Sequence, residues 1–157
     1  GLFSSFAMLM NITRRGKMPT MGKVVEYSVR DEDRHCAGMT KLFRVFVEDE
    51  HRDLLDDEFK RDVYDLFRKA VSLEDAVIDT AFEMGAVTDL TPDVMKTFIR
   101  YMADRRLTGI GFKPNWGVEV NPLPWFEELI GAVKMTNFFE LNPTEYSKLD
   151  NSTDDYF

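Results

Sequence analysis

The sequence predicts an all-α fold, and three observations carry that prediction. Apolar residues recur at spacings of three and four through several long segments. No segment keeps the strict alternation of a half-buried strand, and signals for helix starts and stops separate the segments. With 157 residues, 44% of them hydrophobic and 31% charged, the chain is long enough for one helical unit with its own core. We therefore expect one bundle of helices.

The first half of the chain predicts three helices. Residues 2–13 are apolar nearly all round, which is typical of a helix in the middle of a bundle. The segment RGKMPTM interrupts this pattern, and a second helix is expected from Gly22 to about Glu50, followed by a third over 53–84 with a joint at Ser72. The apolar stripe of the second helix comprises Val25, Val29, Cys36, Met39, Leu42, Phe43 and Phe46, and that of the third comprises Phe59, Val63, Leu66, Ala70, Leu73, Val77 and Ala81.

The second half predicts one more long helix and a polar end. Thr91 followed by Pro92 and Asp93 is a strong helix start, because it offers a capping hydroxyl, a proline in the first turn and an acid at the positive end of the dipole. This helix should end near Leu107. A loop rich in glycine and proline follows, then a short segment over 125–133, and after Pro143 the chain becomes polar, which is typical of a mobile tail.

Charge and cysteine content exclude several partners. The formal net charge is −8 and no long basic run occurs, so we expect no nucleic acid. The apolar opening segment is too short, and too soon followed by Arg14 and Arg15, to span a bilayer, so we expect no membrane. The lone Cys36 cannot form an internal disulfide, which favours a reducing compartment and predicts a cytoplasmic protein.

The stretch VEYSVRDEDRHCAGM places a charged run on the second predicted helix. Glu32 and His35 are three apart, so both side chains project from nearly the same side and can bind one metal ion together. Helical bundles that hold two irons or manganeses repeat this E-x-x-H unit. Glu32 also continues the stripe of Val25 and Val29, where an unpaired buried carboxylate would be costly. The alternative is a solvated helix face, where E-x-x-H occurs often by chance.

Five segments, in order along the chain, resemble the small (beta) subunit of class I ribonucleotide reductase. They are LFSSFAMLMN, RDE-x-x-H, YMADRRLTGIGF, NPLPWFE and TNFFELNPTEY. The resemblance implies a ferritin-like helical bundle of which this chain is the C-terminal half alone. Residues 1–134 would be the bundle portion with the second E-x-x-H unit, and residues 135–157 the C-terminal segment and flexible tail.

The resemblance also assigns metal-site residues. It implies that Glu32 and His35 are ligands of a di-metal centre, with iron as the first expectation and manganese or a mixed Mn/Fe pair as alternatives. Asp31 would be the neighbouring carboxylate that hydrogen-bonds within the chain of groups linking the metals to the surface. The remaining ligands would lie in an N-terminal half, the first expected partner. Three positions that line the metal cavity in the family are expected here as core residues: Leu2, Phe6 and Ser28.

The C-terminal segment carries the other expected functional residues. Tyr146 matches the family's tail tyrosine, which passes the oxidising equivalent to the large subunit. Tyr156 and Phe157 end an acidic tail and would dock on that large subunit as aromatic anchors. The assembled small subunit is expected to form a homodimer.

The implied function is that of a ribonucleoside-diphosphate reductase component. With its N-terminal half the chain would house a metal–radical centre, and the large subunit would reduce ribonucleotides to deoxyribonucleotides for DNA replication. Without both partners it would be inactive. The alternatives are a di-metal oxidase or oxygenase on the same bundle and a metal-free helical interaction module, and co-purifying partners would distinguish the three.

Overall fold

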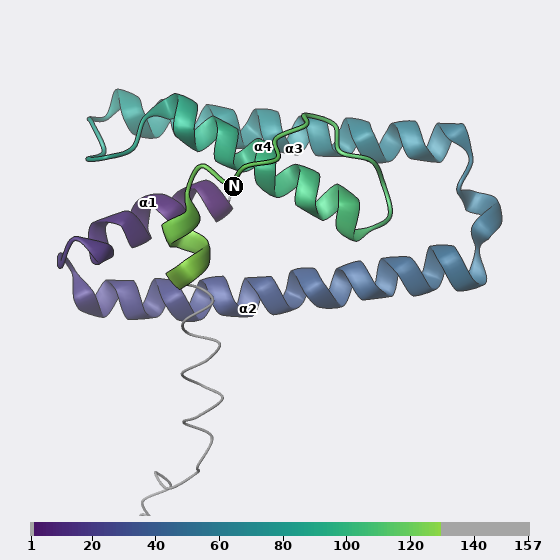
Figure 1. The fold of residues 1–157 in the computed structure, drawn as a ribbon, viewed down its shortest axis with the longest axis horizontal. Coiled ribbons are helices and arrows are strands. Elements are labelled where there is room, and N and C mark those ends of the chain that lie inside the picture. Colours follow the sequence, from purple (N-terminus) through teal and green to yellow (C-terminus); the bar gives the residue numbers. More distant parts are fainter. Residues whose placement is uncertain (1, 130–157) are drawn as a thin grey trace, which may run out of the picture.

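The computed structural model describes residues 2–129, and its helices confirm the all-α prediction over that range (Figure 1). The long helices are α1 (Leu2–Arg14), α2 (Pro19–Arg44), α3 (Asp57–Glu83) and α4 (Pro92–Gly109). A π-helical turn, η1 (Val45–Glu50), and a 3-10 turn, η2 (Arg52–Leu54), connect α2 to α3, and residues 124–129 are also helical. No helix in this range is both long and apolar enough to cross a membrane.

The two longest helices, α2 and α3, run along opposite edges of the molecule and are joined at one end by η1 and η2 (Figure 1). Helix α4 packs along α3, and α1 packs along α2. Because α1 also contacts α3 and α4, the two pairs close around one core. The core includes Ala7, Met10, Val25, Val29, Val71, Ile78, Met95, Phe98, Ile99, Leu123 and Phe126, with Trp116 and Trp125 packed against it.

The helix ends follow local chemistry that the sequence showed only in part. The Val94 N–H donates to Thr91 Oγ1 at 3.2 Å, which confirms the predicted start of α4. Helix α3 begins later than expected because Asp56 is its cap, with the Phe59 N–H donating to Asp56 Oδ1 at 2.7 Å. The predicted joint at Ser72 is wrong, since α3 is continuous through that exposed residue.

The predicted apolar stripes are only partly buried. In the stripe predicted for the second helix, Val25 and Val29 are in the core, but Met39 and Leu42 of α2 and Phe46 of η1 are exposed. On α3 the prediction chose the wrong face: the core side chains are Val71, Glu74 and Ile78, whereas the stripe that includes Leu66 and Leu73 faces outward. Periodicity identifies an apolar side of a helix but does not say which neighbour covers it. Phe43 and Phe59 of the two stripes stack on each other, with ring centroids 6.3 Å apart, whereas Leu66 and Leu73 are exposed.

The loop after α4 is organised by one buried carboxylate. Asp104 is 5% exposed, and its Oδ1 accepts the backbone N–H groups of Asn115 at 2.7 Å and Trp116 at 3.0 Å. Its Oδ2 accepts the Val118 N–H at 3.1 Å. Charge-assisted bonds of this kind are stronger than neutral ones, so Asp104 fixes the path of the chain out of α4.

We expect Asp104→Asn to destabilise the chain by about 2–4 kcal/mol, because the amide replaces one acceptor oxygen with a donor that faces a backbone N–H. Asp31→Asn is the control, since Asp31 is exposed on α2, away from this loop, and lies 3.6 Å from Arg34 Nη1 one turn along the helix. Urea unfolding followed by circular dichroism measures both. Equal stability of the two variants would show that Asp104 does not hold the loop.

Candidate metal centre on helix α2

Glu32 and His35 lie one turn apart near the middle of α2 and approach each other. His35 Nδ1 is 3.8 Å from Glu32 Oε2, as the spacing of three residues predicts. One carboxylate and one imidazole form a donor set that suits iron or manganese. The two side chains therefore can contribute to one metal site from the same side of the helix.

The surroundings of this pair differ from the expectation. Glu32 was predicted to be buried, but its side chain is 31% exposed and that of His35 is 75% exposed. The side of α2 that carries them also exposes Val24, Met39 and Leu42. We call this side, from Val24 to Leu42, the open face of α2. Val25 and Val29, which precede Glu32 in the same stripe, are buried where α1 packs along α2, so Glu32 lies at the edge of the covered side and His35 lies beyond it.

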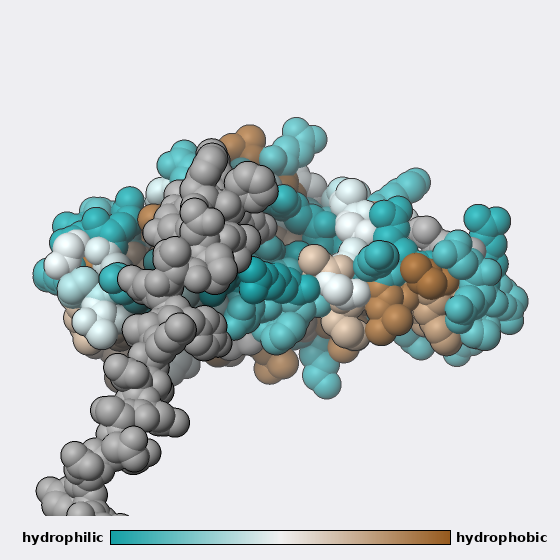
Figure 2. All heavy atoms as spheres, turned by 90° about the horizontal axis from the view of Figure 1, so that it is seen from below, coloured by the Kyte–Doolittle hydropathy of each residue, from teal (hydrophilic) through white to brown (hydrophobic). Residues whose placement is uncertain are grey.

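Figure 2 shows this part of the molecule from the α2 side. The surface is mostly hydrophilic, but apolar side chains gather towards the end where α2 leads into η1. The exposed apolar residues of that region are Met39, Leu42, Val45 and Phe46. Two potential ligands beside exposed apolar side chains are typical of a surface that another structural element covers.

The described residues supply an incomplete cage. Within residues 2–129 no group of three or more His, Cys, Asp or Glu side chains is placed to hold a metal ion. The nearby Cys36 donates its S–H to Glu32 Oε1 at 3.8 Å. Burial raises the pKa of the Cys36 thiol, which favours the protonated form over the thiolate that metals bind. Glu32 and His35 thus fit a metal site as two of its ligands.

The other predicted residues of α2 are more exposed than expected. Asp31 is exposed and lies 3.6 Å from Arg34 Nη1, a surface ion pair one turn along the helix. Ser28 was expected in the core but is exposed, because it lies on the outer side of α2, where its hydroxyl donates to the Val24 carbonyl at 3.1 Å. Phe6 is half-buried and packs on the core as predicted. The Leu2 side chain, Tyr146, Tyr156, Phe157 and the boundary at 134/135 lie outside the described residues.

An ion pair between α2 and α4, next to Glu32 in the sequence, was not predicted. Arg106 of α4 reaches α2, with its Nη2 3.6 Å from Asp33 Oδ1, and its guanidinium lies over the Phe3 ring at 5.6 Å. Asp33 projects from the side of α2 that faces α4, so this contact helps to fix the rotation of α2 and keeps Glu32 and His35 outward. The repeated arginines of ADRR were the only sequence signal, and they did not identify Asp33 as the partner.

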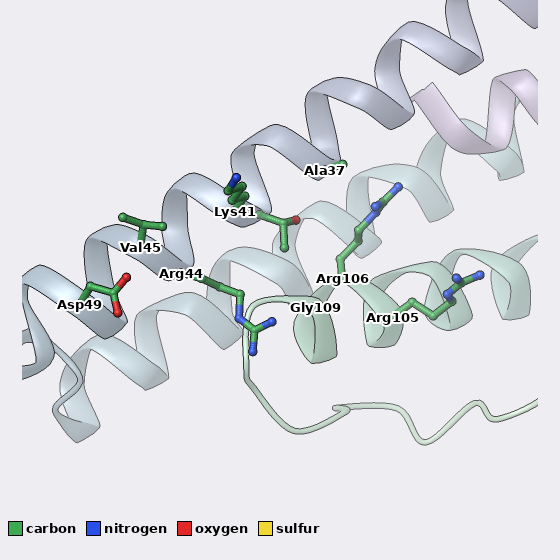
Figure 3. Close-up of a pocket in the computed structure, with 9 residues that line it drawn as sticks. Ala37, Lys41, Arg44, Val45, Asp49, Arg105, Arg106 and Gly109 are labelled. Atoms are coloured by element: carbon green, nitrogen blue, oxygen red, sulfur yellow. The ribbon is translucent and has the colours of Figure 1, made fainter. Parts of the chain in front are cut away.

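A pocket of about 490 Å³ lies between α2 and α4, and its lining includes Lys41, Arg44, Arg105 and Arg106 (Figure 3). The guanidinium groups of Arg105 and Arg106 point away from that of Arg44. Arg105 pairs with Glu127 and Arg106 with Asp33. The cations therefore do not converge on one point, and the pocket offers no second candidate site.

Comparison with known proteins gives consistent results. Residues 1–122 match the family model described as "Ribonucleotide reductase, small chain". The chain is 46% identical, over 147 residues, to a probable ribonucleoside-diphosphate reductase small subunit of Invertebrate iridescent virus 3, covering 94% of this chain and 39% of the relative. It is 32% identical, over 149 residues, to the ribonucleoside-diphosphate reductase subunit beta of Chlamydia pneumoniae, covering 95% and 42%.

Solved structures show the same likeness. A putative class I ribonucleotide reductase from Bacillus halodurans superposes with a TM-score of 0.75 at 26% identity, covering 82% of this chain and 45% of that chain. The ribonucleotide reductase R2 subunit from Clostridium botulinum gives a TM-score of 0.74 at 21% identity, with 82% and 40% covered. The chain spans less than half the length of these relatives.

Proposed function

Because the chain belongs to the small (beta) subunit family of class I ribonucleotide reductase, we propose that it provides the C-terminal half of that enzyme's metal-bearing subunit. The structural likeness confirms the predicted ferritin-like bundle. The observation that carries the proposal is the pairing of Glu32 with His35 on the open face of α2, in a chain that spans less than half of its relatives.

Glu32 and His35 would be two ligands of a di-metal centre, and the remaining ligands would come from the part of the family fold that the chain does not include. Iron is the metal we propose first, with manganese or a mixed pair as alternatives, because the donors are oxygen and nitrogen. When bound, the metals would supply the oxidant that the enzyme stores and transfers to the large subunit.

Other residues of the chain would support that site. The Asp33–Arg106 contact holds the Asp33 side of α2 against α4. Glu32 and His35 would then face the segment that supplies the remaining metal ligands. The Cys36 thiol donates to Glu32 Oε1, while Oε2 is the atom nearest His35. Asp31, which pairs with Arg34, would join the hydrogen-bonded chain towards the surface once that face is covered.

The C-terminal segment would connect this centre to the second subunit. We propose that Tyr146 relays the oxidising equivalent and that Tyr156 and Phe157 dock on the large subunit, where ribonucleotides are reduced to deoxyribonucleotides. The tail sequence supports docking, because Asp154 and Asp155 precede the two aromatic residues and offer charge steering beside apolar anchors. We place the assembled subunit, a homodimer, in the cytoplasm.

A chimera tests the proposal directly. The part of the iridescent virus 3 relative that precedes the region of similarity is fused to residues 1–157 and assayed with a class I large subunit for conversion of ribonucleotides to deoxyribonucleotides. We expect metal-dependent turnover by the chimera and none by the 157-residue chain. A chimera that binds metal and consumes O₂ without nucleotide reduction would favour the oxidase alternative, and one that binds no metal would favour the interaction module.

The docking role of the tail gives a separate prediction. A peptide covering residues 150–157 should compete with the chimera for the large subunit. Phe157→Ala in the peptide should weaken competition more than Asp150→Ala, because apolar anchors usually outweigh rim charges. Inhibition of turnover by increasing peptide concentrations measures it. A peptide without effect at millimolar concentration would show that this segment does not dock.

A further inference from the structure

A second cavity, of about 370 Å³, lies where α1, α2, α4 and the segment over 121–127 meet. Its apolar wall consists of Phe3, Val29, Phe98, Met102 and Phe126. Val29, Phe98 and Phe126 are buried, and the last two rings pack edge to face with centroids 5.5 Å apart. Ligand sites in proteins usually occupy roughly 300 to 1,000 Å³. The cavity therefore has the size of a site for a small organic molecule.

Two ion pairs form the polar part of this cavity wall. Arg106 Nη2 lies 3.6 Å from Asp33 Oδ1, and Arg105 donates to Glu127. Glu127 also accepts a hydrogen bond from Asn121 Nδ2 at 2.9 Å. The hydrogen bond from Arg105 lowers the pKa of the Glu127 carboxyl, so this group stays ionised and paired. Because each carboxylate of the wall already has an arginine partner, the wall does not favour a cation as its ligand.

One donor in the wall needs an acceptor. Within residues 2–129 the Nε–H of Arg106 is buried and donates to no group. Arg106 extends away from Arg44 (Figure 3) and lines the second cavity. A buried N–H without an acceptor is costly. A water molecule could accept this bond, but it fills only about 30 Å³ and would leave most of the apolar wall uncovered. A ligand that carries an oxygen acceptor on an apolar body meets both needs.

We propose that this cavity binds a small aromatic carboxylate. Its ring would pack against Phe98, Met102 and Phe126, and one carboxylate oxygen would accept the Nε–H of Arg106. Aromatic rings pack favourably on aromatic and methionine side chains, and a charge-assisted hydrogen bond is stronger than a neutral one. Every lining residue lies within residues 2–129, so the inference goes beyond the proposed function and does not depend on the metal centre.

Titration with 1-naphthylacetate tests the site in the 157-residue chain and in the chimera. Isothermal titration calorimetry measures its binding beside that of 2-(1-naphthyl)ethylamine, a cation with the same ring. We expect the carboxylate to bind both proteins with a Kd below about 1 mM, and about tenfold more tightly than the amine, because only the carboxylate can accept from Arg106. Equal affinity for the two probes, or no binding of the carboxylate by the folded chimera, would overturn the proposal.

Arg106→Met and Arg44→Met form a matched pair of variants. Each removes one positive charge from the region between α2 and α4, but only Arg106 lines the second cavity. We expect Arg106→Met to weaken binding of the carboxylate about tenfold and to leave binding of the amine unchanged, whereas Arg44→Met should change neither. Equal effects of the two substitutions on the carboxylate would refute the role of Arg106. Circular dichroism checks that both variants are folded.

Methionine methyl NMR locates the probe in the chain with its own sequence. Met102 lines the cavity, whereas Met39 and Met84 are 63% and 87% exposed elsewhere. In protein labelled with ¹³C at the methionine methyl groups, saturating 1-naphthylacetate should shift the Met102 signal and leave the signals of Met39 and Met84 in place. A shift of either exposed methionine equal to that of Met102 would show adsorption to exposed apolar side chains and would overturn the proposal.

Discussion

Replacement of Glu32 or His35 by alanine is expected to abolish metal binding by the completed subunit. The two side chains converge to 3.8 Å on the open face of α2, and a cage that loses either one loses a direct ligand. Metal content of the purified chimera, measured by elemental analysis, should fall from a metal pair to a trace for each variant. Nucleotide reduction should disappear together with the metal.

Glu26→Ala is the matched control for this result. Glu26 is the same residue type on the same helix, is partly buried, and lies on a different side of α2 from Glu32. We expect this variant to retain metal and turnover. Retention of a full metal pair by Glu32→Ala or His35→Ala, at the level of Glu26→Ala, would remove both residues from the ligand set.

Tyr146→Phe is expected to leave the metal centre intact and reduce nucleotide reduction to background. A relay residue must lose and regain an electron and a proton at each turnover, which the phenol O–H of tyrosine allows and the phenyl ring of phenylalanine does not. Phenylalanine has nearly the same size and apolar area, so folding, metal loading and binding to the large subunit should be unchanged. The measurement is metal content, spectroscopy of the oxidised centre and turnover at saturating large subunit.

Tyr156→Phe provides the comparison within the same segment. Because Tyr156 is proposed as a docking residue, this variant should need more large subunit but reach normal turnover at saturation. Substantial turnover by Tyr146→Phe would transfer the relay role to Tyr156, the other tyrosine of the tail.

The fold could be predicted in outline because helices carry local signals. Periodicity identified α2 and α3, the apolar run over 2–13 identified α1, and Thr91 with Pro92 gave the start of α4. The buried side of α3 could not be predicted, because this helix has more than one apolar side and the choice depends on distant segments. The contacts that decide it, Ser4 with Glu74 and Arg100 with Asp75, join residues far apart in the sequence.

The candidate site could also be predicted from the sequence only in part. The approach of His35 to Glu32 follows from helix geometry and was predicted. The exposure of both side chains was not, because the prediction treated the stripe from Val25 and Val29 onward as continuously buried. Asp33 and Arg106 were missed because their contact crosses from α2 to α4 and neither residue belongs to an apolar pattern. The role of Asp104 in holding the 115–118 loop was missed for a similar reason.

Glu32 and His35 would belong to a metal site that the described residues, 2–129, do not complete by themselves. The most direct measurement is equilibrium dialysis against iron(II) or manganese(II), followed by elemental analysis, for the isolated chain and the chimera in parallel. We expect the isolated chain to lose its metal on dialysis and the chimera to retain a metal pair in each subunit. A tightly held metal pair in the isolated chain, or no metal in a folded chimera, would contradict the account.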